Sequence, residues 1–396
     1  MKNRVFASSA LFAALICCNS LPVLFGESSG IVAGTVVALW GALCALELRS
    51  GQKPNSTAIV IAVLLLIAHL LSYAFHPSEI GTRYLSNYLI YGALFLLIPM
   101  GNIDFNRVLK IAFYYGVILL PFYARYDYGY GINEVGEFEG GILMTMSYRM
   151  LPFILAALFV TLNKTNKVWE RVLGIVVITL YLLIFLIVGA RGAITSLFAF
   201  LAIYYIISGK ERMQKIARLS IMGIVAIVFF TSFDFIIDYL FNLLDTRGVS
   251  SRSIERMYYS SIAGGDVSAG RFKIYKMAFN EFLQSPIWGN GIGSFDSYKG
   301  TFPHNIFLQL MVEGGLFFVI PFTVLLIRGL VYIFEKGGKT ASGGIMLFVF
   351  CSGMIRLFFS SYLWGSHFCW LFILLALNIK VFRKNERNSI SNNTYI

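Results

Sequence analysis

The sequence predicts an all-helical integral membrane protein, and two observations support that fold class. Hydrophobic residues make up 58% of the chain and charged residues 13%, whereas soluble domains carry about 25% charged residues. Apolar runs of about 15 to 24 residues recur along the whole chain, and most could cross a hydrocarbon core of about 30 Å. Helices are the expected spanning elements, because strands of a membrane barrel alternate with period two and these runs do not.

We expect about twelve transmembrane helices from these runs. They lie at approximately residues 5–25, 31–48, 57–75, 84–100, 108–123, 146–162, 172–189, 193–207, 219–237, 305–328, 343–359 and 361–379. The expected organisation is transmembrane helices 1–9 in residues 1–237, one long exterior loop in 238–303, transmembrane helices 10–12 in 304–380, and a polar tail in 381–396.

Lysine and arginine are unevenly divided between the two sets of short links. One set carries a dense series of cations from Lys2 to Arg387, whereas the other carries little beyond Arg83, Arg125, Arg149 and Arg191. Because cations favour cytoplasmic links, we expect both termini in the cytoplasm and loop 238–303 outside. The net charge of +12 follows from this bias, and no basic-aromatic module points to nucleic-acid binding.

The cysteines and the N-terminus add little chemistry. All five cysteines fall inside apolar runs, so no exterior disulfide framework is expected, and no C-x-x-C spacing suggests a metal site. The first run follows Lys2 and Arg4 but lacks a convincing cleavage site, which favours an uncleaved helix.

The exterior loop contains two expected helices. Residues 250–262 could form a short one, and a second runs from Ala269 to Gln284, ahead of Ser285-Pro286. On a helical wheel its apolar face holds Phe272, Tyr275, Ala278, Phe279 and Phe282, with Lys273, Lys276 and Asn280 opposite. Arg271 falls in the apolar stripe, where an unpaired charge is costly. Its partner is either a carboxylate (Asp266, Glu281 or Asp296) or an anionic substrate.

A glycine-rich stretch follows, from Pro286 to Phe295. Gly289, Gly291 and Gly293 superficially resemble a phosphate loop, but no lysine or helix follows where that motif needs one. We expect a tight turn.

His304 and Asn305 stand directly before the apolar run that begins at Ile306. On a straight helix, His304, Leu308, Met311 and Gly315 would line one side. Asn305, Gln309 and Glu313 would be turned away by roughly 100–180°, so Glu313 is expected to cap or pair between helices. A single histidine at a helix start is alternatively a satisfied interfacial residue.

Arg191 lies between two apolar runs, flanked by Gly189 and Gly192, at the expected exterior face. It either extends to lipid phosphates or packs inward. Together with Arg271 and His304 it suggests a constellation of guanidiniums and an imidazole at the outer leaflet.

Arginine can bind a diphosphate through two parallel hydrogen bonds and neutralise it as a leaving group. A histidine near its pKa can take a proton from a sugar hydroxyl. We therefore predict glycosyl transfer from a polyprenyl-diphosphate donor, with no cofactor. The predicted catalytic residues are His304, Arg271 and Arg191, and the predicted substrate-binding residues are Asn305, Arg247, Arg252, Arg256, Tyr275, Lys273 and Arg149.

A metal-dependent transferase is the competing hypothesis. Glu137 and Glu139, in the exterior stretch 124–141, could hold a divalent cation. No oriented basic partner accompanies them.

Four segments resemble the bacterial O-antigen ligase/polymerase superfamily. They run from Gly189 to Gly192, Ala269 to Tyr275, Ser285 to Phe295 and His304 to Gly315, within about residues 172–330. The resemblance implies a GT-C-like helical fold in the bacterial inner (cytoplasmic) membrane. It also implies metal-independent chemistry on undecaprenyl-diphosphate-linked glycans at the periplasmic face. Arg191 and Arg271 would bind diphosphate, and His304 would activate or orient the acceptor.

One departure bears on the acceptor. Ligases of this superfamily tend to carry Gly-x-x-Gly after His-Asn, and here Phe318 stands three residues after Gly315. The sequence therefore favours a polymerase of lipopolysaccharide repeat units over a ligase. The acceptor would be a second lipid-linked glycan, with lipid A-core as the ligase alternative and a chain-length regulator as a further partner. A flippase for lipid-linked sugars is the rival from another class, although such transporters usually show repeated halves.

Overall fold

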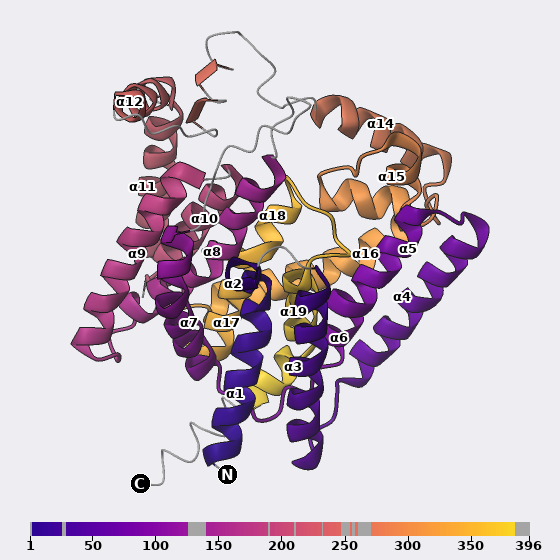
Figure 1. Cartoon of the computed structure of the whole chain (residues 1–396), viewed down its shortest axis with the longest axis horizontal. Coiled ribbons are helices and arrows are strands. Elements are labelled where there is room, and N and C mark those ends of the chain that lie inside the picture. The colour runs from indigo at the N-terminus through magenta and orange to yellow at the C-terminus, as the bar shows by residue number, and fades with distance from the viewer. Residues whose placement is uncertain are drawn as a thin grey trace. The chain divides into compact units, whose positions relative to one another are not determined.

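The computed structural model describes residues 2–25, 29–125, 140–188, 191–209, 211–231, 233–246, 254–255, 258–259 and 271–384. None of these residues lies in a β-strand, and most are helical (Figure 1). The prediction of an all-helical protein is confirmed for the described chain.

The N-terminal helices are α1 (Lys2–Cys17), α2 (Pro22–Phe25), α3 (Ser29–Arg49), α4 (Ser56–Phe75), α5 (Glu79–Asn87), α6 (Leu94–Leu96) and α7 (Phe105–Arg125). The central helices are α8 (Gly140–Leu162), α9 (Val168–Val188), α10 (Arg191–Ile207), α11 (Arg212–Thr231) and α12 (Phe233–Asp245). The C-terminal helices are α14 (Arg271–Gln284), α15 (Ser294–Lys299), α16 (Ile306–Lys336), α17 (Ala341–Val349), α18 (Ile355–Leu357) and α19 (His367–Leu377). Wider π-helical turns join α5 to α6 at Tyr88–Ala93 and α17 to α18 at Phe350–Met354.

Six helices among the described residues are long and apolar enough to cross a membrane. These segments are Gly30–Arg49, Ser56–Phe75, Phe105–Arg125, Thr145–Leu162, Val168–Phe185 and Ile306–Lys336. Shorter apolar helices cover Gly192–Ile207, Ala341–Leu357 and His367–Leu377. The chain is thus a multi-pass membrane protein, and the number twelve stays a prediction. The expected run 219–237 falls partly in α11 and partly in α12.

The chain divides into two compact units. The first contains Met1–Cys18, Ser29–Val108 and Arg271–Ile396, and the second contains Asn19–Ser28 and Leu109–Gly270. The expected loop 238–303 is therefore shared between the units, with the division at Gly270. Arg191 belongs to the second unit, whereas Arg271 and His304 belong to the first.

The second unit is built around α8, which packs against α9 and α10. Buried Glu170 accepts hydrogen bonds from Lys110 Nζ at 3.1 Å and Tyr114 Oη at 3.0 Å. Tyr181 donates to the Gly116 carbonyl at 2.7 Å. These bonds tie α9 to α7 through polar groups that would otherwise be unsatisfied in an apolar setting.

In the first unit, α16 packs against α14, α15, α17 and α19. Figure 1 shows α14 and α15 near the junction of α4 and α5. Helix α14 confirms the expected amphipathic segment from its first described residue, Arg271. The predicted apolar face is right for Ala278 and Phe282, which are buried, and wrong for two other residues. Phe272 and Phe279 are 73% and 45% exposed. Ile274, which the prediction did not include, is partly buried against the cluster of Ala278, Phe295 and Val312.

Helix α16 is interrupted at Gly315, where φ is 58° and ψ is −152°. The expectation of a straight helix from His304 to Gly315 and beyond is therefore wrong. In an unbroken helix, the amides of Leu316 and Phe317 would bond the carbonyls of Val312 and Glu313. The interruption leaves all four groups without those partners.

The turn that begins at Pro286 supplies the missing hydrogen bonds. The amides of Asn290 and Gly291 donate to the carbonyls of Val312 and Glu313 at 2.6 and 3.1 Å. The amides of Leu316 and Phe317 donate to the carbonyls of Pro286 and Ile287 at 2.9 and 3.2 Å. Such substitution is how a broken helix is tolerated at membrane depth. The turn predicted from the glycines is confirmed.

Glycine is required on both sides of this contact. A Cβ on Gly315 would lie 2.5 Å from the Ile287 carbonyl carbon, and one on Gly289 would lie 2.5 Å from the Glu313 carbonyl carbon. Both residues also have positive φ, at 58° and 71°. Neither close neighbour is a flexible side chain, so neither site can accept a side chain without moving the backbone.

Replacing Gly315 or Gly289 with alanine is expected to lower the thermal stability of the purified protein markedly. The backbone conformation at Gly315 alone costs about 1–3 kcal/mol for a residue with a side chain, before the clash is added. Size-exclusion chromatography of heated, detergent-solubilised protein measures the effect. Gly41→Ala in α3 is the control, because no heavy atom lies within 4 Å of its added Cβ. Equal melting of all three variants would contradict this account of the turn.

Candidate functional site

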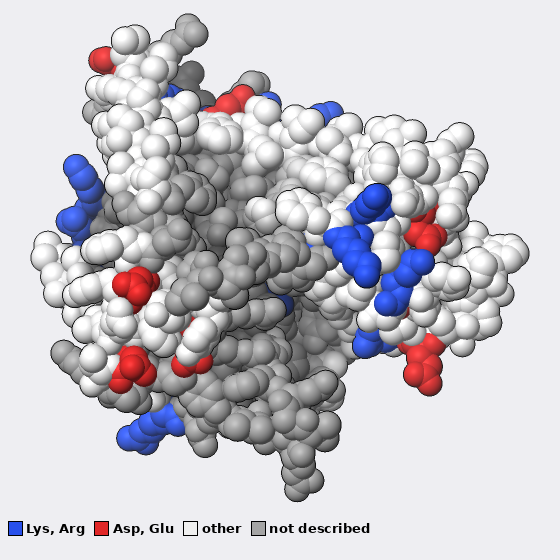
Figure 2. Space-filling view, turned by 90° about the horizontal axis from the view of Figure 1, so that it is seen from above, with Lys and Arg blue, Asp and Glu red and all other residues white. Residues whose placement is uncertain are grey.

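Arg271 and His304 are brought together by the packing of α14 on α16. Arg271 is the first residue of α14, and His304 stands just before α16. The Arg271 guanidinium lies near enough to His304 for its charge to lower the pKa of the imidazole. Figure 2 shows Lys and Arg side chains grouped at the right of the face viewed from above, the side on which Figure 1 places α14 and α15.

His304 has an unusual backbone conformation. Its φ of 55° is the one positive value among non-glycine residues of the described chain, and a left-handed conformation costs roughly 1–2 kcal/mol for a residue with a Cβ. The next residue, Asn305, caps α16, since its side-chain oxygen accepts from the amides of Phe307 and Leu308 at 3.0 and 3.2 Å. Its side-chain nitrogen donates to the Phe358 carbonyl at 3.3 Å. The predicted substrate-binding residue Asn305 thus fixes the helix start.

The imidazole of His304 is half-buried against an aromatic ring. The ring centroids of Phe302 and His304 are 4.1 Å apart, and Tyr362 follows at 5.6 Å from Phe302. Nδ1 is buried and has no hydrogen-bond partner within the described structure. Burial lowers the pKa of His304 below its ordinary value, and Arg271 lowers it further, whereas Asp296 opposes them. The neutral imidazole is therefore favoured, which is the form that can accept a proton.

Asp296, from α15, completes the charge distribution around His304. Its side chain is buried, accepts a hydrogen bond from Tyr84 Oη at 2.9 Å and lies 3.4 Å from Arg83 Nη2. The carboxylate is thereby held in place by α5. It sits where it can stabilise a positive charge that forms on His304.

Two arginines that the prediction did not use lie close to this cluster. Arg83 in α5 and Arg356 in α18 both act electrostatically on the Tyr362 hydroxyl, which accepts a hydrogen bond from Asn87 at 2.7 Å. Arg356 lies within the apolar run 343–359, and a charge inside such a run is a recognisable functional signal. Asp296 had no comparable signal, because a single acid in a polar loop is ordinary.

The carboxylates considered as structural partners of Arg271 are mostly engaged elsewhere. Glu281 pairs with Lys299 at 3.3 Å, and Asp296 pairs with Arg83. Asp266 lies outside the described residues. Of the carboxylates considered, the two that are described are therefore paired with cations other than Arg271, whose half-buried guanidinium suits an anionic ligand.

The other predicted site residues lie on α14, on α8 and α10 of the second unit, or outside the described residues. Lys273 is exposed on α14 and Tyr275 is half-buried. Arg149 lies in α8 of the second unit, with Nη1 3.7 Å from Met146 Sδ. Arg191 begins α10, also in the second unit, and its side chain is not among those described. Arg247, Arg252 and Arg256 lie outside the described residues, as do Glu137 and Glu139.

Glu313, expected to pair between helices, does so. Oε1 accepts from Gln309 Nε2 at 3.1 Å and from the Gly293 amide at 3.3 Å, and Oε2 accepts from Trp364 Nε1 at 2.8 Å. This buried carboxylate joins α16 to the glycine turn and to the segment before α19. Among the described residues, no group of three or more His, Cys, Asp or Glu side chains could hold a metal ion.

Part of the chain is similar to a known protein family. Residues 174–323 match a family model described as O-Antigen ligase. The matched stretch includes Arg191, Arg271, Asp296, His304 and the interruption of α16. It confirms the resemblance to the O-antigen ligase/polymerase superfamily. No curated protein matches the chain.

The titration of His304 tests the electrostatics of this site directly. In the full-length protein labelled with ¹³C-histidine, we expect a midpoint below the ordinary value of about 6.5. Arg271→Gln should raise the midpoint because it removes a nearby positive charge, and Asp296→Asn should lower it because it removes a negative one. His304→Asn identifies the resonance by its loss. Midpoints that do not move in opposite directions would contradict the arrangement.

Proposed function

We propose that this member of the O-antigen ligase/polymerase superfamily is a glycosyltransferase of the bacterial inner membrane. It would polymerise undecaprenyl-diphosphate-linked O-antigen repeat units at the periplasmic face. The observation that carries the proposal is that Arg271, at the start of α14, and Asp296, in α15, both lie near enough to the half-buried His304 to influence its pKa. All three residues lie within the stretch that matches the family.

The chemistry follows from these groups. A hydroxyl oxygen of the acceptor sugar attacks the anomeric carbon of the donor and forms the new glycosidic bond. The bond between that carbon and the diphosphate oxygen breaks, and its electron pair leaves with undecaprenyl diphosphate. His304 takes the hydroxyl proton, while Arg271 stabilises the charge on the leaving diphosphate. Arg191 is proposed as a second guanidinium for the diphosphate.

Asp296 and Arg271 couple the protonation of His304 to the binding of the donor. Before the donor binds, Arg271 disfavours protonation of His304. A bound diphosphate would neutralise that guanidinium, and Asp296 would then stabilise the imidazolium that forms during transfer. The base therefore becomes a better proton acceptor when the donor is present.

The ligase remains the alternative within the family. Its donor and its chemistry would be the same, with lipid A-core as the acceptor. The absence of a second glycine after Gly315, where Phe318 stands, favours the polymerase. Deletion of the gene distinguishes the two activities. Loss of a polymerase leaves lipopolysaccharide that carries single repeat units, whereas loss of a ligase leaves lipopolysaccharide that carries no O-antigen.

Arg271→Ala and His304→Ala are each expected to abolish polymer formation while the protein is still inserted in the membrane. Either change removes a charge or a proton acceptor that the transfer needs. The lipopolysaccharide banding pattern of a complemented deletion strain, with an immunoblot of membranes, is the measurement. Lys276→Ala, on an exposed part of the same helix, is the control that should preserve long chains.

His304→Asn addresses the strained backbone separately, because asparagine tolerates the left-handed conformation. It should retain normal protein levels and still lack polymer. Chain-length ladders of wild-type appearance in these variants would reject the site assignment. They would reopen the flippase hypothesis.

Excess EDTA is expected to leave transfer unchanged in a reconstituted assay with lipid-linked donor. The proposed leaving-group stabilisation comes from arginine and requires no cation. Glu137→Gln/Glu139→Gln should likewise retain activity. Loss of activity in EDTA that is restored by added Mg²⁺ or Mn²⁺ would favour the metal-dependent hypothesis instead.

A further inference from the structure

We infer that a cavity between α4, α14 and α15 is a subsite for an uncharged sugar residue of the glycan, distinct from the diphosphate site at Arg271. This inference rests on the proposed function and adds a specificity site to it. The cavity has a volume of about 850 Å³, which is large enough for a sugar and its hydration water.

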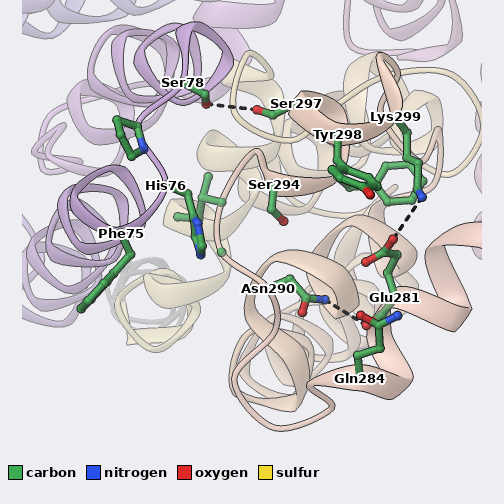
Figure 3. A pocket seen from close by; sticks show the side chains of 14 residues that line it. Phe75, His76, Ser78, Glu281, Gln284, Asn290, Ser294, Ser297, Tyr298 and Lys299 are labelled. Carbon is green, nitrogen blue, oxygen red and sulfur yellow. Dashed lines mark hydrogen bonds and ion pairs between the residues drawn. The ribbon is translucent and has the colours of Figure 1, made fainter.

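Four segments of the first unit form the walls. The end of α4 contributes Phe75 and His76, α14 contributes Glu281 and Gln284, and the glycine turn contributes Asn290 to Ile292. Helix α15 closes the remaining side with Ser294, Ser297, Tyr298 and Lys299. Figure 3 shows His76, Ser294, Asn290, Glu281 and Lys299 arranged around the space, with Phe75 toward one end.

The lining is rich in uncharged hydrogen-bonding groups. Amides, hydroxyls and a phenol come from Gln284, Asn290, Ser294, Ser297 and Tyr298. Ser294 Oγ is buried and has no hydrogen-bond partner among the described residues. Since a buried hydroxyl without a partner costs about 1–3 kcal/mol, a ligand hydroxyl that bonds it would be stabilised.

The charges of the lining cancel one another. Glu281 and Lys299 form an ion pair at 3.3 Å, so the wall offers no net charge to an anion. This contrasts with the surroundings of His304 and Tyr362, where Arg271 acts on the histidine, Arg83 and Arg356 act on the tyrosine, and Asp296 is the acid that opposes them. A neutral polyhydroxylated ligand fits the cavity better than a phosphate does.

Aromatic surfaces complete the match to a sugar. Phe75 and Tyr298 are 76% and 80% exposed although both border the cavity. The C–H face of a pyranose can pack on such rings while its hydroxyls bond the amide and hydroxyl groups nearby. Lys299 lies over the Tyr298 ring at 4.5 Å and helps to fix its position.

Hydrogen bonds link the walls of the cavity to one another. The Ile292 amide donates to Ser72 Oγ at 2.9 Å, and Ser297 donates to Ser78 Oγ at 3.0 Å. The Asn290 side chain donates to the Glu281 carbonyl at 2.9 Å. These bonds join α4, the N-cap of α5, α14 and α15 around the space, so little ordering would be needed on binding.

Helix α15 separates the cavity from the proposed reaction centre. Ser294, Ser297, Tyr298 and Lys299 line the cavity, whereas Asp296 of the same helix bonds Arg83 and Tyr84 and acts on His304. A helix with its side chains is about 10 Å across. The subsite would therefore hold a sugar beyond the one that reacts.

Binding of a lipid-free, phosphate-free oligosaccharide tests the inference. The probe is a single repeat unit released from the surface polysaccharide of the source strain, titrated into full-length protein in detergent by calorimetry. Gln284→Ala/Tyr298→Ala should raise Kd about tenfold or more, since a hydrogen bond and a packing face are lost. Asn280→Ala, an exposed amide of α14 outside the cavity, should bind as the wild type does.

Gln284→Trp, which places an indole at the cavity wall, provides a second variant and should also weaken binding. Both altered side chains are exposed, so folding should be retained, as checked by thermal melting. Equal Kd values in all variants would overturn the subsite. So would displacement of the oligosaccharide by inorganic pyrophosphate, because that would place the sugar at the Arg271 site.

Failure of the subsite inference can be distinguished from failure of the proposed function. His304→Ala should bind the oligosaccharide normally while losing polymer. If His304→Ala instead keeps polymer, the function fails, and the cavity variants still report on the subsite.

Discussion

The arrangement of the candidate site depends on the backbone hydrogen bonds between the glycine turn and the interruption of α16. Gly315 breaks the helix, and the turn from Pro286 to Gly291 satisfies the four backbone groups that the break leaves. Since unsatisfied backbone groups are costly in an apolar environment, the break and the turn stabilise each other. The turn connects α14 to α15, so its position fixes Arg271 on one side and Asp296 on the other relative to His304.

The electrostatics of His304 depend on this placement. Burial and Arg271 favour the neutral imidazole, and Asp296 favours the charged one. Asp296 is itself held by Arg83 and Tyr84 from α5. Helix α5 therefore also influences whether the neutral or the charged form of His304 is favoured. The positive φ of His304 is kept by the Asn305 cap directly after it. Backbone strain of this kind persists where the surroundings over-determine it.

Helix α15 divides two chemical environments. One side carries the acid that acts on His304, and the other lines a cavity whose charges cancel. A lipid-linked glycan also has two parts, an anionic diphosphate and a chain of hydroxyl-rich sugars. The arrangement of charged and uncharged groups across one short helix corresponds to that division. It gives a physical basis for holding the donor or acceptor at two points during transfer.

The sequence by itself determined the elements whose signals are local. Apolar runs predicted the helical membrane fold, Ser285-Pro286 predicted the end of α14, and His304-Asn305 predicted the start of α16. Its predicted apolar face of α14 was right for Ala278 and Phe282 but wrong for Phe272 and Phe279. Those two phenylalanines resemble core residues in the sequence, and only the packing of Ala278 with Phe295 and Val312 shows which side is covered. The roles of Asp296 and Arg83 and the break at Gly315 also came from tertiary structure alone. Each depends on a partner distant in the sequence, and spacing along one segment carries no information about such a partner.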